Sequence, residues 1–353
     1  MKILFVGYLA WGTTSDYRMR ALQSAYQTVY CIDLCDYVGE YTVRSVVERV
    51  WLRVGWSPSK KRLRLRLIRD VGRFKPDLVW MEHCALVDAD LVRAIHQAHR
   101  CTVLHYTPDS LRAPGVKTRH LVEAVPEYEA LVTTKHHEIK EYEAMGARRV
   151  LFTHQGFDPF IHHPWKLSPD EEFQYGCDVM FAGQCMNFRR QAVESLARRT
   201  QPRAFIYGRQ WKPSDPAIEG LIRYRPWVFA EEYAKAICGA KIGLAFLNRE
   251  VGDTHTTRTF EIPACGVLMI AERTAQQMEL FQEDKEAVFF ETEEEMVDKV
   301  EFYLGNERAR ERIAAAGRAR CIRANCTWQH RVSALVQALG FEEASVRPQE
   351  IPA

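Results

Sequence analysis

The sequence lacks the features that would place the chain in a membrane, in an oxidising compartment or on nucleic acid. No apolar run reaches the length of about 18 residues that a membrane-spanning helix needs. The apolar run at the amino terminus is too short for a signal peptide, and none of the ten cysteines lies in a C-x-x-C pair or a zinc-ligand spacing. The formal net charge of +2 gives no global attraction to nucleic acid. We therefore expect a cytoplasmic protein with reduced thiols and no nucleic-acid partner.

The length of 353 residues favours two domains over one core. Both halves alternate short apolar runs with segments of helical periodicity, which is typical of doubly wound parallel sheets. The first half predicts strands near Ile3–Gly7, Thr28–Asp33, Leu78–Glu82, Thr102–Tyr106, Ala130–Thr133 and Val150–Thr153. The second half predicts strands near Asp178–Ala182, Arg203–Tyr207, Ile242–Phe246, Val267–Ile270 and Ala287–Phe290. The fold class is therefore α/β, with two Rossmann-like domains.

Segments of helical periodicity separate these strands. In the first half they are Asp16–Ala25, Thr42–Val54, Lys60–Phe74, Asp88–Ala98 and His137–Met145. In the second half they are Arg190–Arg198, Ala230–Cys238, Arg258–Ala264, Ala275–Phe281, Glu293–Leu304 and Glu307–Arg320. We expect a first domain over 1–155, a proline-punctuated linker over 156–174, a second domain over 175–327, a helix over 328–341 that crosses back to the first domain, and a flexible tail over 342–353.

The richest loop in the second half runs from Gly252 to Glu261, GDTHTTRTFE. Ligands of open α/β sheets bind at the carboxyl ends of the strands, and this loop follows an expected strand. Thr256 and Thr257 can expose backbone N–H groups at the start of the next helix, where the helix dipole favours a phosphate. The loop therefore predicts a phosphate site.

Two charged residues extend this loop. Arg258 offers a planar positive fork for a diphosphate, and Glu261, one helical turn later, can accept hydrogen bonds from both hydroxyls of a ribose. This spacing predicts a site for a nucleoside diphosphate. A structural alternative stays open, in which Thr256 caps a short helix, Arg258 is solvated and Glu261 pairs with it.

The segment Arg258–Ile270, RTFEIPACGVLMI, resembles the C-terminal core of glycosyltransferases, especially the spore-maturation CgeB-like group and its relatives in the retaining family 4. Other segments resemble the same proteins in the same order: HQGFDPF (154–160), DVMFAGQCMNFRR (178–190), FIYGRQW (205–211) and AKIGLAFLN (240–248). The resemblance implies a GT-B architecture, with two Rossmann-like domains that face an interdomain cleft. It also implies an acceptor-side first domain and a second domain that binds a nucleotide-diphosphate sugar, with Glu261 on the ribose.

The sequence departs from the family 4 pattern at one position. Those enzymes carry a second glutamate seven residues before the ribose glutamate, and this chain has Thr254 there. The missing carboxylate leaves the stereochemical outcome open. Asp253 or His255 is a hypothetical substitute.

Three further residues are candidates for donor binding. Arg189 and Arg190 follow an expected strand, and the resemblance implies that one of them contacts phosphate. Consecutive arginines at a helix start are, alternatively, surface charge. Gly208 can let the backbone approach the nucleotide, and its aromatic neighbours Tyr207 and Trp211 either pack near the base or belong to the core.

The loop after the first strand holds two more candidates, Gly12 and Thr13. This loop is neither a G-x-G-x-x-G fingerprint nor a Walker loop, so dinucleotide or ATP binding has no direct support. In GT-B enzymes the matching loop faces the donor phosphate or the acceptor. The resemblance therefore adds Gly12 and Thr13 to the predicted site.

Asp109 and His83 are the candidate catalytic residues, because each follows an expected strand of the first domain. A general base must reach an acceptor hydroxyl, and a histidine or a buried carboxylate can be tuned for that role. The alternatives are a turn at Asp109 after Pro108 and a His83 packed in the sheet. A retaining mechanism needs neither residue as a base.

We expect no metal at the donor site. GT-B enzymes commonly stabilise the leaving diphosphate with arginines and helix dipoles. Asp88-Ala89-Asp90 has the spelling of an Asp-x-Asp metal motif, but it lies at an expected helix start, where acidic residues favour the dipole.

The segment Lys60–Lys75 contains eight basic residues and a single acidic one, Asp70. A basic amphipathic helix of this kind could contact anionic lipid and bring the protein to a membrane-surface acceptor. The favoured interpretation is a helix packed on the sheet with a solvated basic face, because FKPDLVW must re-enter the sheet directly afterwards. Peripheral membrane contact stays open.

The predicted function is transfer of a sugar from a nucleotide-diphosphate sugar to an unidentified acceptor, which is a sugar, a protein, a lipid-linked molecule or a small molecule. No cofactor besides this donor is expected. One alternative is a non-catalytic nucleotide-sugar-binding or scaffold protein with the same fold, motivated by Thr254. A sugar-nucleotide epimerase is a second alternative.

Overall fold

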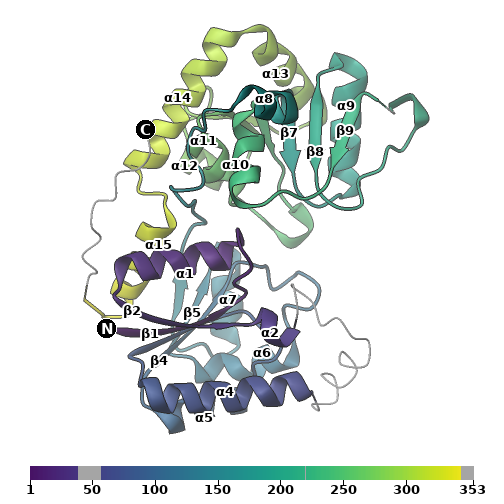
Figure 1. Ribbon diagram of the computed structural model, residues 1–353. Coiled ribbons are helices and arrows are strands. Elements are labelled where there is room, and N and C mark those ends of the chain that lie inside the picture. Colours follow the sequence, from purple (N-terminus) through teal and green to yellow (C-terminus); the bar gives the residue numbers. More distant parts are fainter. Residues whose placement is uncertain (39–56, 219, 343–353) are drawn as a thin grey trace. The chain divides into compact units, whose positions relative to one another are not determined.

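The chain divides into two compact units in the computed structural model, which describes residues 1–38, 57–218 and 220–342 (Figure 1). The first unit comprises the described residues of Met1–His154, the short segment Glu250–Asp253 and the helix that begins at Trp328. The second unit comprises the described residues of Gln155–Arg249 and Thr254–Thr327. The chain therefore contributes three separate segments to the first unit.

A six-stranded parallel sheet forms the centre of the first unit, in the order β2-β1-β3-β4-β5-β6. Its strands are β1 (Lys2–Gly7), β2 (Thr28–Asp33), β3 (Leu78–Glu82), β4 (Thr102–Thr107), β5 (Ala130–Thr133) and β6 (Val150–Phe152). Helices cover both faces, so the central strands are mainly apolar, and every residue of β3, including Glu82 at its end, is buried.

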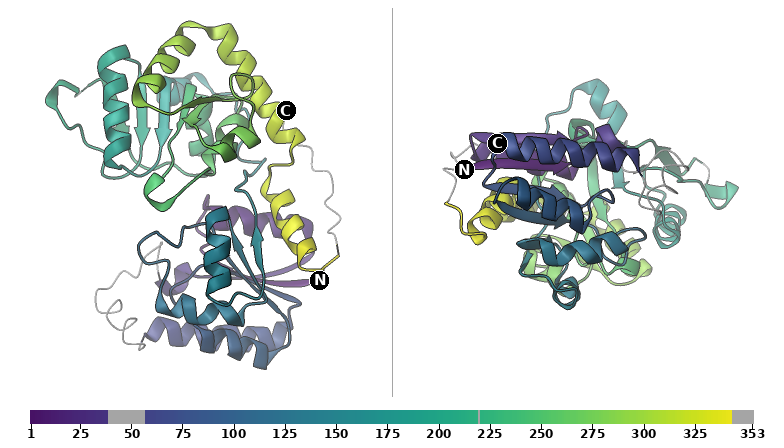
Figure 2. Two further views of the ribbon diagram at one scale, coloured as in Figure 1. Left: turned by 180° about the vertical axis from the view of Figure 1, so that it is seen from behind. Right: turned by 90° about the horizontal axis from the view of Figure 1, so that it is seen from below.

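Helices α1 (Thr14–Ala25) and α15 (Trp328–Ala338) lie together on one face of this sheet, and α4 (Pro58–Phe74) and α5 (Ala89–Ala98) cover the other (Figures 1 and 2). Helix α4 packs through Leu63, Leu67 and Val71, which recur at every fourth position and are fully buried. The shorter helices of the unit are α2 (Cys35–Val38), α6 (Arg119–Ala124), η1 (Val125–Glu127), η2 (His136–Glu138) and α7 (Ile139–Ala144).

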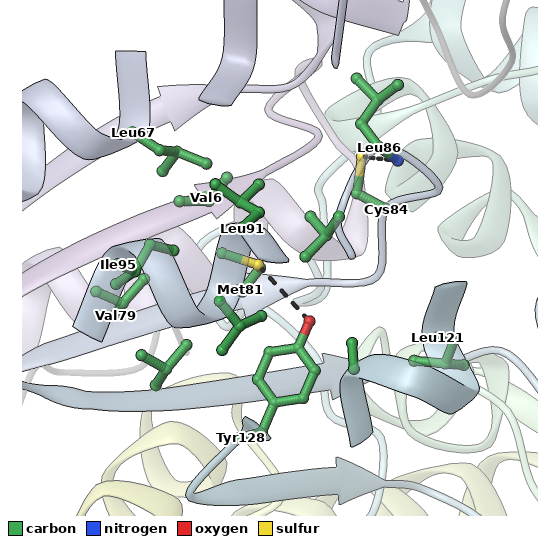
Figure 3. Packing of buried hydrophobic residues seen from close by; sticks show 14 of the residues in the cluster. Val6, Leu67, Val79, Met81, Cys84, Leu86, Leu91, Ile95, Leu121 and Tyr128 are labelled. Carbon is green, nitrogen blue, oxygen red and sulfur yellow. Dashed lines mark hydrogen bonds between the residues drawn. The ribbon is translucent and has the colours of Figure 1, made fainter. Parts of the chain in front are cut away.

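The main hydrophobic cluster of the first unit fills the space between the sheet and the helices α4 and α5 (Figure 3). Val79 and Met81 of β3 pack with Leu91 and Ile95 of α5, and all four are at most 1% exposed. The hydroxyl of Tyr128 donates to Sδ of Met81 at 3.9 Å, so the one polar atom of this ring is not stranded in the core (Figure 3).

On the opposite face of the sheet, a buried ion pair joins helix α1 to strand β3. Arg18 of α1 donates from Nε to Oε1 of Glu82 at 2.8 Å and from a terminal nitrogen to Oε2 at 2.7 Å. The guanidinium also lies over the rings of Tyr106, at 4.3 Å, and Trp328, at 4.9 Å. One side chain therefore ties α1 to two strands and to the start of α15.

The second unit is also built on a six-stranded parallel sheet, in the order β12-β11-β10-β7-β8-β9. Its strands are β7 (Cys177–Ala182), β8 (Ala204–Tyr207), β9 (Ile222–Arg225), β10 (Ala240–Ala245), β11 (Leu268–Glu272) and β12 (Val288–Phe290). Its helices are α8 (Pro169–Tyr175), α9 (Asn187–Thr200), η3 (Pro216–Ile218), α10 (Ala230–Cys238), η4 (Arg249–Val251, which ends in the first unit), α11 (Arg258–Ala264), α12 (Ala275–Leu280), α13 (Glu293–Gly305) and α14 (Glu307–Arg323).

The two parallel sheets confirm the predicted α/β class with two Rossmann-like domains. The linker expected over 156–174 stays a prediction, and its last part contains the helix α8, which begins at Pro169 and is capped by Ser168. Strand β9 was not predicted, since its sequence IRYR carries two arginines and lies at a sheet edge, where charged residues are tolerated. The helix predicted over Thr42–Val54 and the tail after Glu342 lie outside the described residues.

Candidate functional site

Glu261 lies in the first turn of α11, and only 4% of the residue is exposed. Its Oε2 accepts a hydrogen bond from the hydroxyl of Tyr233 at 3.1 Å, and the Thr257 side chain donates to the same carboxylate. Nε2 of His162 lies 3.7 Å from Oε1. Burial raises the pKa of Glu261 to about 7, although these hydrogen bonds and the charge of Arg258 oppose the shift. The carboxyl group therefore gains or loses its proton near neutral pH.

Arg258 is fixed at the carboxyl ends of two central strands. One terminal nitrogen donates to the carbonyl of Ala182 and the other to that of Phe246, each at 3.1 Å. The guanidinium lies 5.3 Å from the ring centre of Phe181, and its buried Nε has no hydrogen-bond partner among the described residues. This arrangement holds a positive charge at the edge where open α/β sheets bind ligands.

The start of α11 does not match the structural alternative in which Thr256 caps the helix and Arg258 is solvated. Thr257 precedes the first helical residue, and its side chain makes no capping hydrogen bond. The N–H of Thr256 donates to the hydroxyl of Thr259 at 3.1 Å, while Oγ1 of Thr256 is buried without a partner in the described part of the chain. Thr256 is thus not a helix cap, and Arg258 is bound to carbonyls instead of being solvated.

His255 is buried and connects the loop to two neighbouring segments. Its Nε2 accepts the backbone N–H of Gln155 at 3.0 Å, which places the proton on Nδ1 for donation to Oε1 of Gln276, also at 3.0 Å. The hydroxyl of Thr254 donates to the same oxygen. Both nitrogens of His255 therefore hold the loop in place.

Asp253 and Gly252 belong to the first unit, unlike the residues of the predicted donor loop from Thr254 onward. Its carboxylate lies 3.1 Å from Nζ of Lys135, which follows β5. The hydroxyl of Ser110, after β4, donates to the carbonyl of Val251 at 2.8 Å. The short segment Glu250–Asp253 is thus anchored on loops of the first unit.

Arg189 and Arg190, both in α9, have different surroundings. Arg189 is buried, with its guanidinium 5.5 Å from the ring centre of Phe181. Arg190 is half-buried and donates to Oδ1 of Asn187 at 3.2 Å. Arg190 therefore has more surface for an anion than Arg189, and phosphate contact by either residue stays a prediction.

The close approach at Gly208 is to another backbone segment. With φ at 150°, a Cβ at this position would lie 2.2 Å from the carbonyl oxygen of Gly183. Nε1 of Trp211 donates to the same oxygen at 2.9 Å, and both Tyr207 and Trp211 are buried. The two aromatic residues pack in the core, and a contact between Gly208 and a nucleotide remains a prediction.

Gly12 and Thr13 shape the turn between β1 and α1. Gly12 has φ of 80°, and its N–H donates to Oδ2 of Asp16 at 3.3 Å. The Thr13 hydroxyl accepts the N–H of Asp16 at 3.1 Å and donates to the carbonyl of Tyr8 at 2.9 Å, so Thr13 is the N-cap of α1. Contact of Gly12 or Thr13 with a ligand stays a prediction.

His83 and Asp109 follow the neighbouring strands β3 and β4. Nδ1 of His83 is buried without a partner among the described residues, and the ring meets that of His105 edge-on, with centres 5.7 Å apart. Burial lowers the pKa of His83, and the charge of Asp109 partly opposes this shift. Asp109 itself is exposed. The two predicted catalytic residues therefore lie at the same edge of the first sheet.

The structure adds residues that sequence reasoning missed. Tyr233 and His162 contact Glu261, and Gln276 links His255 to Thr254. Tyr233 lies inside a correctly predicted helix but carried no spacing signal toward the loop 28 residues later. His162 lies two residues after the segment HQGFDPF (154–160), whose resemblance to glycosyltransferases was the one available hint.

The described residues contain no cluster of three or more His, Cys, Asp or Glu side chains that could hold a metal ion. Within the same part of the chain, no helix is both long and apolar enough to cross a membrane.

Comparison with known proteins assigns the fold. Residues 189–337, which include every candidate of the second unit from Arg189 onward, match a family model described as glycosyl transferase-like. The sucrose-phosphate synthase of Thermosynechococcus elongatus is 11% identical, with a TM-score of 0.68, and the alignment covers 96% of this chain and 98% of that one. No curated protein sequence matches the chain.

Two further similar structures are described with bound UDP-glucose or UDP-2-fluoro glucose. HepE from Anabaena in complex with UDP-glucose is 11% identical, with a TM-score of 0.63 and coverage of 96% of this chain and 99% of that one. An Escherichia coli structure described as trehalose-6-phosphate bound with UDP-2-fluoro glucose is 11% identical, with a TM-score of 0.64 and coverage of 98% and 100%. The chain has the fold of GT-B glycosyltransferases, and its second unit carries a glycosyl transferase-like sequence.

Proposed function

We propose that this protein is a glycosyltransferase that moves a sugar from a nucleotide-diphosphate sugar to an acceptor, without a metal ion. The carrying observation is the pair formed by Arg258 and Glu261 on one short helix at the carboxyl end of the second sheet. The glycosyl transferase-like sequence match over the same residues supports this proposal.

In this proposal the second unit binds the donor. Glu261 accepts the ribose hydroxyls, while Arg258, which is already oriented by two carbonyls, faces the diphosphate. Thr256, with its unpartnered buried hydroxyl, and Arg190 are additional donors to phosphate oxygens. A fixed arrangement of this kind stabilises the negative charge that develops on the leaving diphosphate without first reorganising.

The first unit would supply the acceptor-side groups. Because burial lowers the pKa of His83, its imidazole is neutral at neutral pH and can accept a proton from an acceptor hydroxyl. Asp109, exposed and close enough to influence that imidazole, is positioned to stabilise the protonated form. This role applies to an inverting reaction, since a retaining one needs no enzyme base.

The test begins with the donor. UDP-sugars are screened first, because two of the similar structures hold UDP-sugars, and GDP-, dTDP- and CMP-sugars follow. We expect Glu261→Ala to weaken binding of the nucleotide sugar that this screen selects by about 1.5–3 kcal/mol, or one to two decades in affinity. Isothermal calorimetry and a thermal melt of each variant separate binding from folding.

Glu194 provides the matched control. It is another buried glutamate of the second unit, 3% exposed, and its carboxylate accepts the N–H of Ser214 at 2.8 Å outside the candidate site. Glu194→Ala should leave donor affinity unchanged in the folded fraction. Equal losses in both variants, or no loss in a folded Glu261→Ala, would remove Glu261 from the donor site.

A non-catalytic nucleotide-sugar-binding protein is the second candidate. The observation that favours it is Thr254, which is hydrogen-bonded to Gln276 where family 4 enzymes carry a glutamate. This candidate predicts stabilisation by a nucleotide sugar with neither transfer nor hydrolysis under single-turnover conditions. Product release in that assay rejects it.

Peripheral membrane contact through α4 also remains a proposal. Lys61, Leu65, Arg69 and Arg73 are exposed along one side of this helix, while Leu63, Leu67 and Val71 are committed to the core. Flotation with vesicles that contain or lack anionic lipid tests it, and equal flotation would reject an electrostatic contact.

A further inference from the structure

Two cysteine thiols meet where α10 and α11 end. Cys238 is the last residue of α10, and Cys265 follows the last residue of α11. The Cys238 thiol lies 3.4 Å from the carbonyl oxygen of His163 and 3.8 Å from that of Cys265, and the two cysteine side chains are close enough to shift each other's pKa. Two cysteine residues 27 positions apart in the sequence are therefore neighbours in space.

Only one of these cysteines borders the surface. Cys238 lines a pocket of about 610 Å³, together with Trp165, Lys166 and Lys241, whereas Cys265 is 3% exposed. The backbone N–H of Trp165 donates to Sγ of Cys238 at 3.3 Å. A small solute in the pocket can therefore approach Cys238 but not Cys265.

The pKa shifts of the two thiols also favour reaction at Cys238. The hydrogen bond from the Cys265 thiol lowers the pKa of Cys238, with burial opposing and the N–H of Trp165 assisting. Burial raises the pKa of Cys265, and so does its hydrogen bond to Cys238. The thiolate, which is the reactive form of cysteine, thus forms first on the residue that borders the pocket.

We propose that Cys238 and Cys265 form a modification site in which a hydroperoxide entering the pocket oxidises Cys238 and Cys265 then closes a disulfide. In the first step the Cys238 thiolate attacks a peroxide oxygen, a sulfur–oxygen bond forms, the oxygen–oxygen bond breaks, and the leaving hydroxide takes up a proton. In the second step the Cys265 sulfur attacks the sulfenic sulfur, and hydroxide leaves and takes the Cys265 proton as water. Hydrogen peroxide is reduced to two waters, and the two thiols are oxidised to one disulfide.

The site would act on the donor residues through the two helices that it joins. Tyr233 of α10 donates to Glu261 of α11, and the N–H of Cys265 donates to the carbonyl of Glu261 at 3.1 Å. A disulfide fixes the separation of the two Cβ atoms near 3.8 Å, so it draws the helix ends into one geometry. This consequence rests on the proposed function, whereas formation of the disulfide does not.

The test treats the folded full chain with hydrogen peroxide, blocks the remaining thiols and maps the peptides by mass spectrometry. We expect a Cys238–Cys265 crosslink, and oxidation of Cys238 at least about tenfold faster than oxidation of Cys177. Cys177 is the matched reference, because it lines the same pocket while burial raises its pKa to about 12.

Variants assign the order of the steps. In Cys265→Ala the reaction should stop at the sulfenic acid on Cys238, which a dimedone probe captures, and Cys238→Ser should give no crosslink, whereas Cys177→Ser should crosslink as the parent does. Thermal melts confirm that each variant is folded. Absence of the crosslink in the parent, or oxidation of Cys177 at the rate of Cys238, would overturn the proposal.

Donor binding provides the separate readout. We expect the oxidised parent to bind the nucleotide sugar at least about threefold more weakly than the reduced parent, with full recovery after dithiothreitol. A crosslink with unchanged affinity would leave the modification site standing and reject its effect on the donor. A parent that binds no nucleotide sugar in either state would instead reject the proposed function.

Discussion

The two units place polar side chains at the carboxyl ends of their strands in different ways. In the second unit, Arg258, His255 and Glu261 all have protein partners that fix their orientation. In the first unit, Nδ1 of His83 and both ring nitrogens of His105 are buried without partners among the described residues. Unpaired buried polar atoms cost stability, so their presence is consistent with a ligand that completes them. The contrast is partial, because Nε of Arg258 and Oγ1 of Thr256 in the second unit also lack partners in the described part of the chain. Under the proposed function, the donor would complete these two atoms and the acceptor would complete the imidazoles of the first unit.

The largest expected effect concerns the buried ion pair between Arg18 and Glu82 in the first unit. Arg18→Ala leaves Glu82 buried without its charge partner, so we expect it to destabilise the first unit by about 3–5 kcal/mol. Tryptophan fluorescence during urea unfolding can follow this unit, because Trp80 donates to Glu82 at 3.0 Å and Trp328 lies under Arg18. Loss of less than about 1 kcal/mol would show that solvent reaches Glu82.

Arg93 is the control for the same unit. It is exposed and forms ion pairs with Asp90 and Glu127, each at 2.5 Å. Because solvent screens exposed pairs, Arg93→Ala should change stability little. A similar loss of stability in both variants would mean that burial of the Arg18–Glu82 pair does not account for its contribution to stability.

The second prediction concerns the pH dependence that Glu261 gives to the second unit. Its pKa is about 7 in the folded protein and 4.5 in the unfolded chain, so the folded state holds the proton more tightly. Stability from this group is fully present below pH 4.5 and is lost as pH rises to about 7. The difference between these pKa values corresponds to roughly 3 kcal/mol.

Glu261→Gln should remove this dependence, because the amide is neutral throughout. Urea unfolding at pH 5 and pH 8 checks it, with the parent losing about 2.5 kcal/mol more than the variant over this interval. The prediction fails if both proteins show the same difference between the two pH values.

The third prediction tests whether the fixed guanidinium serves the diphosphate. Arg258→Ala should weaken binding of a nucleoside diphosphate by about 1.5–3 kcal/mol and leave nucleoside affinity nearly unchanged. Arg190→Ala should show the same selectivity with a smaller loss, because Arg190 is held by a single hydrogen bond to Asn187. Equal affinities of the parent for nucleoside and nucleoside diphosphate would contradict both phosphate assignments.

The sequence predicted the two sheets, and it singled out the loop from Gly252 to Glu261 as the candidate donor site, because both signals are local. Apolar runs mark strands such as β3, and GDTHTTRTFE stands out by composition. The partners of that loop could not be predicted in the same way. Tyr233 reaches Glu261 because α10 and α11 pack on neighbouring parts of one sheet, and this depends on strand order. Strand β9 was missed for the opposite reason, since an edge strand needs little apolar surface.

The smallest expected effect is the response to chelation. Sugar transfer should persist after exhaustive removal of divalent ions, because Arg258 and Arg190 are proposed to stabilise the leaving diphosphate. The bonds from Arg258 to the carbonyls of Ala182 and Phe246 hold this charge in position before the donor arrives. Magnesium also binds free nucleotides and can speed product release, so multiple-turnover rates do not decide the question. Single-turnover transfer with chelator and with restored magnesium isolates the chemical step. If transfer stops with chelator and returns only with a divalent ion, the metal-independent mechanism is wrong, and the exposed carboxylate of Asp109 becomes the first candidate ligand to replace.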